Sequence, residues 1–158
     1  MNKKGKPMLK AIRVTLLALI SSFVAMGAIA NPTKQDAQAL VEKAADFAVK
    51  SGKDQLITEV NKKEGAFNKG ELYVFVYDLQ GTLIADPVNK ALVGQNNVAK
   101  PDAEGKLFRK EIVEVANQSG SGWVDYKFAN PMSGKVEPKS SYVKKQGDVI
   151  IIAGIYVK

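Results

Sequence analysis

The sequence of 158 residues contains no cysteine and no histidine. A Ser–His–Asp triad cannot form without histidine, and without cysteine there is neither a thiol nucleophile nor a disulfide. The residues that usually bind zinc are missing for the same reason. We also find no phosphate-binding loop and no dinucleotide-binding fingerprint. These absences exclude most catalytic and metal-binding chemistry, and we expect no cofactor.

Concentrated charge of one sign is also scarce once the first 30 residues are set aside. The whole chain has a net charge of +7, but five of its 23 basic residues and none of its 16 acidic residues lie in that N-terminal segment. The remainder has 18 basic and 16 acidic side chains, a net charge of +2, with no run of like charge longer than two residues. Nucleic-acid binding requires a clustered basic face. We therefore expect no nucleic-acid partner.

The N-terminal segment has the pattern of a secretory signal peptide. Basic residues precede an apolar stretch from Val14 to Ala25, and Ala28-Ile29-Ala30 has the form of a cleavage site. We expect residues 1–30 to be removed and the mature protein, periplasmic or secreted, to begin at Asn31. The alternative is an uncleaved anchor, because the 17 uncharged residues from Val14 to Ala30 approach the lower limit for a spanning helix. Such a leader would be the only attachment to a membrane.

The remaining 128 residues have the length of one domain. Apolar residues have helical spacing in segments 33–62 and 106–118, and Thr33 and Asp36 have the spacing of a capping box. The predicted strands are 72–77, 82–85, 123–128, 137–145 and 149–157. Short turns between strands favour antiparallel pairing. The predicted fold is α+β: a long or kinked N-terminal helix, interrupted at Ser51-Gly52, packed on a five-stranded antiparallel sheet, with the 86–100 excursion on the other face.

The first strand has two different apolar faces, because its aliphatic residues occupy even positions and its aromatic residues occupy odd positions. The two sets are Leu72, Val74 and Val76, and Tyr73, Phe75 and Tyr77. We expect the aliphatic face to pack against the N-terminal helix, since buried tyrosine hydroxyls need polar partners. The aromatic face is expected to line a pocket, with ordinary core packing as the alternative.

Seven stretches of the chain, in order, resemble the motifs of a known family. They are Tyr77-Asp78-Leu79-Gln80-Gly81, Asp86-Pro87 with Gly94-Gln95-Asn96, Asp102-Ala103-Glu104-Gly105-Lys106 with Phe108, Gly122-Trp123-Val124-Asp125-Tyr126, Asn130-Pro131, Glu137-Pro138-Lys139-Ser140-Ser141-Tyr142-Val143, and Ala153-Gly154-Ile155-Tyr156. Together they cover about residues 36–157. The chain resembles the single Cache domain family of extracytoplasmic, PAS-like sensor domains.

This resemblance implies an exported small-molecule sensor without catalysis, usually the ligand-binding part of a chemoreceptor or sensor kinase. It implies a role in signal transduction such as chemotaxis, with a short organic acid as ligand and a membrane receptor or kinase as partner. The chain departs from the family pattern at Asp86, where a histidine often precedes the proline. The sequence ends soon after the last motif, so we expect a stand-alone exported form.

Lys139 is the residue that the resemblance favours as a ligand-binding cation. Its position alone also fits a solvated lysine on an edge strand, but a lysine in a dry pocket needs an anion. We expect a small anionic organic acid to bind between the sheet and segment 86–108, with its carboxylate near Lys139. The predicted ligand-binding residues are Tyr73, Phe75, Tyr77, Phe108, Trp123, Tyr126, Lys139 and Tyr142. Regular alternation places Tyr142 and Lys139 on opposite faces, so a bulge or twist is required for both to contribute.

Two other function classes remain open from the sequence. A carboxylate-based periplasmic hydrolase would need two acids in one cleft, and Asp78, Asp86 and Asp125 are its candidates. Turn capping is the alternative role for Asp78 and Asp86. An accessory or interaction protein would instead use the surface of the sheet, and a large exposed apolar patch would favour it.

Overall fold

The computed structural model describes residues 31–157. The predicted signal peptide, residues 1–30, lies outside these residues. Within the described part, no helix combines the length and the apolar character that crossing a membrane requires.

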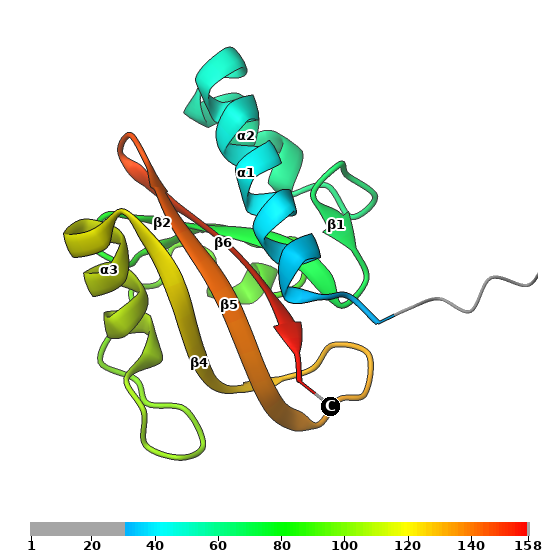
Figure 1. Cartoon of the computed structure of the whole chain (residues 1–158), viewed down its shortest axis with the longest axis vertical. Coiled ribbons are helices and arrows are strands. Elements are labelled where there is room, and N and C mark those ends of the chain that lie inside the picture. The colour runs from blue at the N-terminus through cyan, green and yellow to red at the C-terminus, as the bar shows by residue number, and fades with distance from the viewer. Residues whose placement is uncertain (1–30, 158) are drawn as a thin grey trace, which may run out of the picture. The chain divides into compact units, whose positions relative to one another are not determined.

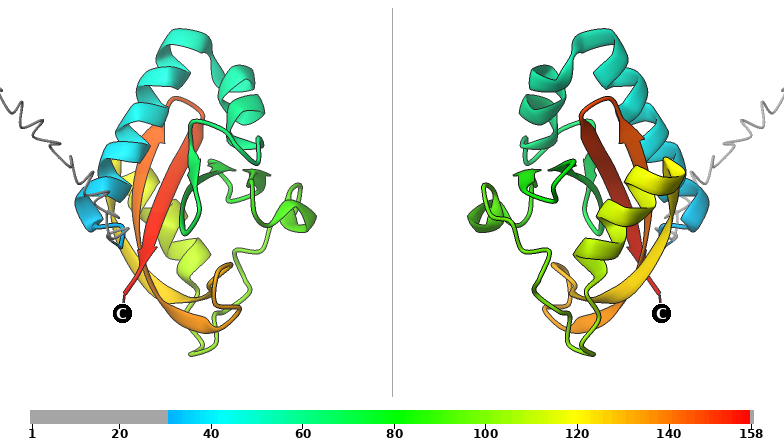
Figure 2. Two further views of the ribbon diagram at one scale, coloured as in Figure 1. Left: turned by 90° about the vertical axis from the view of Figure 1, so that its right-hand side faces the viewer. Right: turned by 90° about the vertical axis from the view of Figure 1, so that its left-hand side faces the viewer.

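The N-terminal helical segment is two helices, which meet at the interruption expected at Ser51-Gly52. Helix α1 spans Lys34–Ser51 and α2 spans Lys53–Val60, and Gly52 between them has φ 86°. A positive φ is accessible to glycine at little cost, so the chain bends there, and α2 turns away from the axis of α1 (Figure 2). The predicted capping box at the start of α1 is confirmed: Asp36 N donates to Thr33 Oγ1 at 3.2 Å, and Thr33 N donates to Asp36 Oδ2 at 2.8 Å.

The sheet has six antiparallel strands, one more than predicted, because a two-residue strand precedes the first predicted one. The order is β1-β2-β6-β5-β4, and β3 pairs with β2. The strands are β1 Asn68–Lys69, β2 Leu72–Asp78, β3 Leu83–Ala85, β4 Ser121–Ala129, β5 Val136–Gln146 and β6 Val149–Tyr156. The C-terminal strand β6 lies between β2 and β5, so residues far apart in the sequence share the middle of the sheet (Figure 1).

Helix α1 covers one face of the sheet, across β5 and β6 (Figure 1). The aliphatic side chains of β2 point to this face, as predicted, and they pack in one core with Leu40, Val41 and Ile151. Fully burying a side chain of this size stabilises a fold by about 1.5–3 kcal/mol. This side of the molecule therefore provides much of its stability.

The opposite face is covered by segment 86–107 and by α3, which spans Phe108–Ser119 (Figure 2). The aromatic side chains of β2 point to this face, and Ile112 and Ala116 of α3 pack with them. Gly120 ends α3 with φ 76°, at the expected position. A short 3-10 helix, η1, covers Lys90–Leu92 in the excursion.

The turn between β2 and β3 holds the excursion against the sheet. Asp78 Oδ1 accepts the backbone N–H groups of Gln80 and Thr82 at 2.9 and 2.8 Å, which confirms its turn-capping role. Gly81 has φ 87°, and a Cβ atom there would lie 2.4 Å from Cγ1 of Val98. Only glycine allows the excursion to approach the turn this closely.

Candidate functional site

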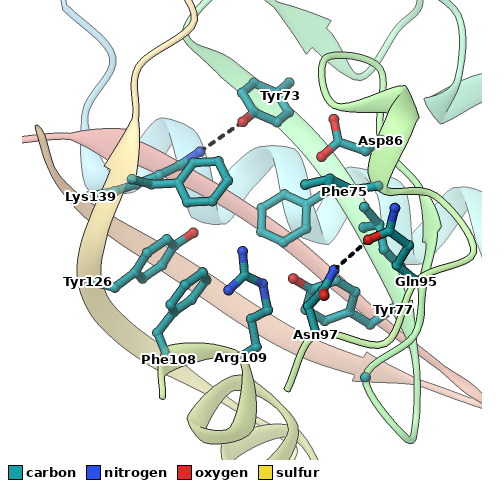
Figure 3. A pocket seen from close by; sticks show the side chains of 14 residues that line it. Tyr73, Phe75, Tyr77, Asp86, Gln95, Asn97, Phe108, Arg109, Tyr126 and Lys139 are labelled. Atoms are coloured by element: carbon teal, nitrogen blue, oxygen red, sulfur yellow. Dashed lines mark hydrogen bonds between the residues drawn. The ribbon is translucent and has the colours of Figure 1, made fainter. Parts of the chain in front are cut away.

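A small cavity lies on the aromatic face of the sheet, under the 86–107 segment and the first turn of α3 (Figure 3). Its volume is about 20 Å³, room for about one water molecule. Six of the eight predicted site residues line it: Tyr73, Phe75, Tyr77, Phe108, Tyr126 and Lys139. They come from β2, α3, β4 and β5, so only the tertiary structure brings them together.

Lys139 is buried at one end of this cavity, with 2% of its surface exposed. Its Nζ donates to the hydroxyl oxygens of Tyr73 at 3.2 Å and Tyr156 at 3.4 Å. The ring centroids of Tyr73 and Tyr156 lie 4.4 and 4.7 Å from Nζ, and those of Phe75 and Phe128 lie 5.7 and 5.6 Å away. The amine is therefore enclosed by neutral groups.

No carboxylate among residues 31–157 forms a salt bridge with Lys139. Burial lowers the pKa of the Lys139 ammonium from its ordinary value of 10.5 to about 7, and the charge of Asp86 raises it by a smaller amount. Burying a charge without a counter-ion is costly, and the group responds by losing its proton more readily. An anion that entered the cavity would reverse this effect.

Asp86 lines the cavity but its carboxylate is engaged in a turn. Oδ1 accepts the N–H groups of Val88 and Asn89 at 2.8 and 2.7 Å, and Oδ2 accepts from Asn89 Nδ2 at 3.2 Å. The backbone N–H of Asp86 donates in turn to Oδ1 of Asn61, just after α2. Asp86 thus fixes the start of the excursion, the turn-capping role considered from the sequence.

The tyrosine hydroxyls around Lys139 belong to a buried polar network. Tyr156 donates to the carbonyl oxygen of Ala129 at 2.8 Å, which leaves its own oxygen free to accept from Lys139. The hydroxyls of Tyr126 and Ser141 lie 2.9 Å apart. Burial raises the pKa of Tyr73 and of Tyr126 well above the ordinary value, and raises that of Tyr156 to about 12. These hydroxyls are neutral hydrogen-bonding groups at physiological pH.

Arg109 is a second cation in the cavity wall that sequence reasoning missed. Its guanidinium carbon lies 4.2 Å from the ring centroid of Phe108, and one N–H donates to the Lys100 carbonyl at 3.2 Å. Burial raises the pKa of Tyr77 to about 12, and the nearby charge of Arg109 lowers it in part. The sequence shows only a basic residue on an amphipathic helix, next to the predicted Phe108. No local signal distinguishes it from a solvated helix arginine.

The outer wall of the cavity consists of polar side chains from the excursion. Asn97 Nδ2 donates to Gln95 Oε1 at 3.2 Å, and Gln95 Nε2 donates to the Ala91 carbonyl at 2.8 Å. Gln95 is exposed and Asn97 is half-buried. This wall therefore borders the solvent.

Trp123 and Tyr142 do not line the cavity, which corrects two of the predicted site residues. They are directly paired on β4 and β5, their ring centroids are 5.3 Å apart, and both lie with the core beneath α1. Tyr126 and Lys139 are also directly paired, three residues away on each strand. An odd separation along a regular strand reverses the face, and the pairing here contains no bulge that would restore it.

The structure does not bring the three candidate acids of the hydrolase hypothesis together. Asp78 caps the β2–β3 turn, Asp86 lines the cavity, and Asp125 is exposed on the other face of β4. Asp102, another acid, accepts backbone N–H groups from Glu104, Lys106 and Lys127. Its carboxylate therefore stabilises the loop before α3.

Comparisons with known proteins identify the family. The chain matches the sequence profile described as Single Cache domain 2 over residues 1–158, and it belongs to this family. It is 28% identical to a solved structure described as the periplasmic sensor domain of a chemotaxis protein, with a TM-score of 0.63 over 78% of this chain and 90% of that one. A methyl-accepting chemotaxis protein from Vibrio parahaemolyticus shares the fold, with a TM-score of 0.69 at 18% identity over 79% and 88% of the two chains.

Two further proteins are similar to this chain. The domain whose structure is titled as the basis for carboxylic acid recognition by a Cache chemosensory domain has a TM-score of 0.62 at 23% identity, over 78% of this chain and 88% of that one. The methyl-accepting chemotaxis protein McpP of Pseudomonas putida is 32% identical over 87 residues, which are 54% of this chain and 16% of that protein. The chain thus spans a small part of that receptor's length.

The fold, the family and the cavity define an extracytoplasmic small-molecule sensor domain. The Cache family is a family of ligand-binding domains rather than of enzymes.

Proposed function

We propose that this domain binds a short-chain carboxylic acid, with the carboxylate paired to the ammonium of Lys139. The observation that carries the proposal is the burial of this amine among tyrosine hydroxyls and aromatic rings, without a salt-bridge partner among the described residues. An unpaired buried charge costs several kcal/mol. A ligand carboxylate would offset that cost, which among residues 31–157 only the charge of Asp86 reduces, and only in part.

The cavity also limits the ligand's size and shape. Its volume of about 20 Å³ holds about one water molecule, so even acetate requires the outer wall at Gln95 and Asn97 to move. The walls near Lys139 are the rings of Phe75 and Phe128, which suit a short alkyl chain. Arg109 adds a second positive charge to the wall. The small volume and the aromatic walls favour small monocarboxylates.

The relatives support the same ligand class. One shares the fold and carries a title naming carboxylic acid recognition, and the descriptions of the three others name chemotaxis proteins. We therefore propose that the domain acts without catalysis and that it passes its signal to a membrane receptor or kinase. No cofactor is part of this proposal.

Export is part of the proposed function, since a sensor of external acids must reach the periplasm. We propose that residues 1–30 direct export and are removed, so that the mature chain begins at Asn31. The intact mass of the protein recovered from the periplasm tests this step. The mass of the complete 158-residue chain would instead indicate a retained anchor.

A thermal-shift titration tests ligand binding. Acetate, propionate, butyrate and succinate are added to the wild type, to Lys139→Met and to Lys145→Met. Lys145 is the matched control because it lies on the same strand, bonds to Asn117 and does not line the cavity. At about 100 times its dissociation constant, a ligand stabilises the fold by about 2.7 kcal/mol. This corresponds to a rise of several degrees in the melting temperature.

We expect at least one acid to stabilise the wild type and Lys145→Met but not Lys139→Met. Equal stabilisation of all three proteins would show that Lys139 is not the partner of the carboxylate. The absence of stabilisation of the wild type by any of the acids would show that the ligand class is wrong.

A further inference from the structure

The surroundings of Lys139 contain several charged or titratable groups, one or more from each element that packs against it. Tyr73 and Tyr77 come from β2, Tyr126 from β4 and Tyr156 from β6, and all four have a pKa raised by burial. Asp86 comes from the excursion and Arg109 from α3. Glu71 and Glu137 lie farther out and act on Tyr156. None of these groups forms a salt bridge with Lys139.

The tyrosines stay protonated through the physiological range, since burial raises the pKa of each, and Arg109 is a cation. The carboxylate of Asp86 is held by N–H donors of its own turn. Within the described part of the chain, Lys139 therefore has no salt-bridge partner that would fix its ammonium form. Its hydrogen bonds to Tyr73 and Tyr156 require only one N–H each, so a neutral amine satisfies them as well.

We propose, on the basis of the carboxylate site proposed above, that the pocket takes up one proton together with each carboxylate and that Lys139 carries this proton. In the free protein, burial favours the neutral amine. A bound carboxylate favours the ammonium, because an opposite charge at contact distance stabilises the charged form. The balanced binding step joins the anion RCOO⁻, a proton and the neutral amine into the ion pair RCOO⁻···⁺H₃N–Lys139. The sum of anion and proton is the undissociated acid.

This coupling predicts how the affinity depends on pH. Below the pKa of Lys139 in the free protein, about 7, the amine already has its proton and the affinity is constant. Above it, the proton must be taken from solution, and the affinity falls about tenfold for each pH unit. The sensor would then respond most strongly when the acid and acidic conditions occur together, as they do when cells excrete organic acids.

Isothermal titration calorimetry of the wild type with acetate provides the main test. Titrations are run at about pH 8, one unit above the pKa of the free amine, in two buffers with different ionisation enthalpies. A proton taken up from the buffer makes the observed enthalpy differ between the buffers in proportion to the number of protons bound. We expect close to one proton per acetate at this pH, and much less than half at about pH 6.

Carbon-13 NMR of the lysine ε-methylene groups provides a second readout, which reports the protonation of Lys139 directly in the wild type. The Lys139 signal, assigned by its absence in Lys139→Met, should titrate near neutral pH without acetate and at a clearly higher pH with saturating acetate. Lys145→Met should keep the same proton uptake as the wild type, since Lys145 lies outside the cavity.

The outcomes separate this inference from the proposed function. Acetate binding with no buffer dependence at either pH overturns proton uptake and leaves the carboxylate site standing. A Lys139 signal that titrates near its ordinary pKa without ligand also overturns it. If no acid binds at any pH, the proposed function fails, and the inference fails with it.

Discussion

The two faces of the sheet are built from alternate residues of the same strands, yet they differ in chemistry. The face beneath α1 is largely aliphatic, with Val74, Val76 and Ile151 fully buried. The opposite face holds Tyr73, Phe75, Tyr77 and Tyr126 around a buried lysine. The first face has little that needs a hydrogen bond, whereas the second depends on a network of hydroxyls and an amine without a counter-ion.

This difference shows how a small domain can tolerate an unfavourable site. A buried amine lowers the stability of the free protein, and net stabilities of domains are only about 5–15 kcal/mol. The aliphatic face supplies apolar burial that offsets this loss, while the strand alternation keeps the two faces chemically separate. A truncation on the aliphatic face should consequently lower the stability of the free protein, whereas replacing the buried amine on the aromatic face should raise it.

The largest effect is expected for Ile151→Ala on the aliphatic face. Ile151 is fully buried, and truncating such a side chain costs about 2–5 kcal/mol of unfolding free energy because a cavity remains. Urea unfolding monitored by circular dichroism measures the loss. Val49→Ala on the outer surface of α1, where Val49 is 69% exposed, is the control and should change little. Acetate should raise the unfolding free energy of Ile151→Ala by the same amount as that of the wild type. A smaller rise would show that the aliphatic face affects ligand binding on the aromatic face.

Lys139→Met on the aromatic face should have the opposite sign. Methionine fills the volume of the lysine stem without a charge, and replacing a buried charge by an apolar group of similar size is often stabilising by about 1–4 kcal/mol. In the absence of a carboxylic acid ligand, we expect Lys139→Met to be about 1–3 kcal/mol more stable than the wild type at neutral pH. Urea unfolding measures this difference. A variant clearly less stable than the wild type would show that the amine contributes net stability through Tyr73 and Tyr156.

The stability gained in Lys139→Met should shrink as the pH rises. The folded-state pKa of Lys139 is about 7, below its ordinary 10.5, so between these values the unfolded chain binds more protons than the folded one. The unfolding free energy of the wild type then rises as the pH increases from about 7 to 10.5, by up to about 1.4 kcal/mol per pH unit. Below about pH 7 the full cost of burying the charged amine is present. Lys139→Met lacks this dependence. The unfolding free energies of the two proteins, measured at several pH values, should therefore approach each other as the pH rises. If the two curves of unfolding free energy against pH were parallel, they would contradict the lowered pKa of Lys139.

The smallest effect is expected at the start of α1. Thr33→Ala removes the side-chain oxygen that accepts from Asp36 N, which costs about 1 kcal/mol for a helix N-cap. Thr58→Ala in α2 is the matched control, because Thr58 Oγ1 bonds only to the Asp54 carbonyl one turn back, a bond of little value to a helix. Chemical denaturation of both variants gives the comparison. Acid binding should be unaffected in either, since the helix cap lies on the face away from the cavity.

Much of the site was predictable, but for different reasons at different residues. The alternation in β2 was enough to separate Tyr73, Phe75 and Tyr77 from their aliphatic neighbours. Lys139 came from the family resemblance, because its position alone also fits a solvated lysine. Arg109 was missed, since an arginine on an amphipathic helix gives no sign that its guanidinium lies over Phe108 in a cavity wall.

The sequence by itself determined most of the helices and strands, because helix capping, strand alternation and turn residues act over a few positions along the chain. It determined the α+β class, the capping box of α1 and the assignment of the two faces of β2. Only the tertiary structure decided which strands are neighbours, and with them which side chains meet. The pairing of β4 with β5 places Tyr126 beside Lys139 and sends Trp123 and Tyr142 to the other face, since strand register depends on contacts between segments far apart in the chain.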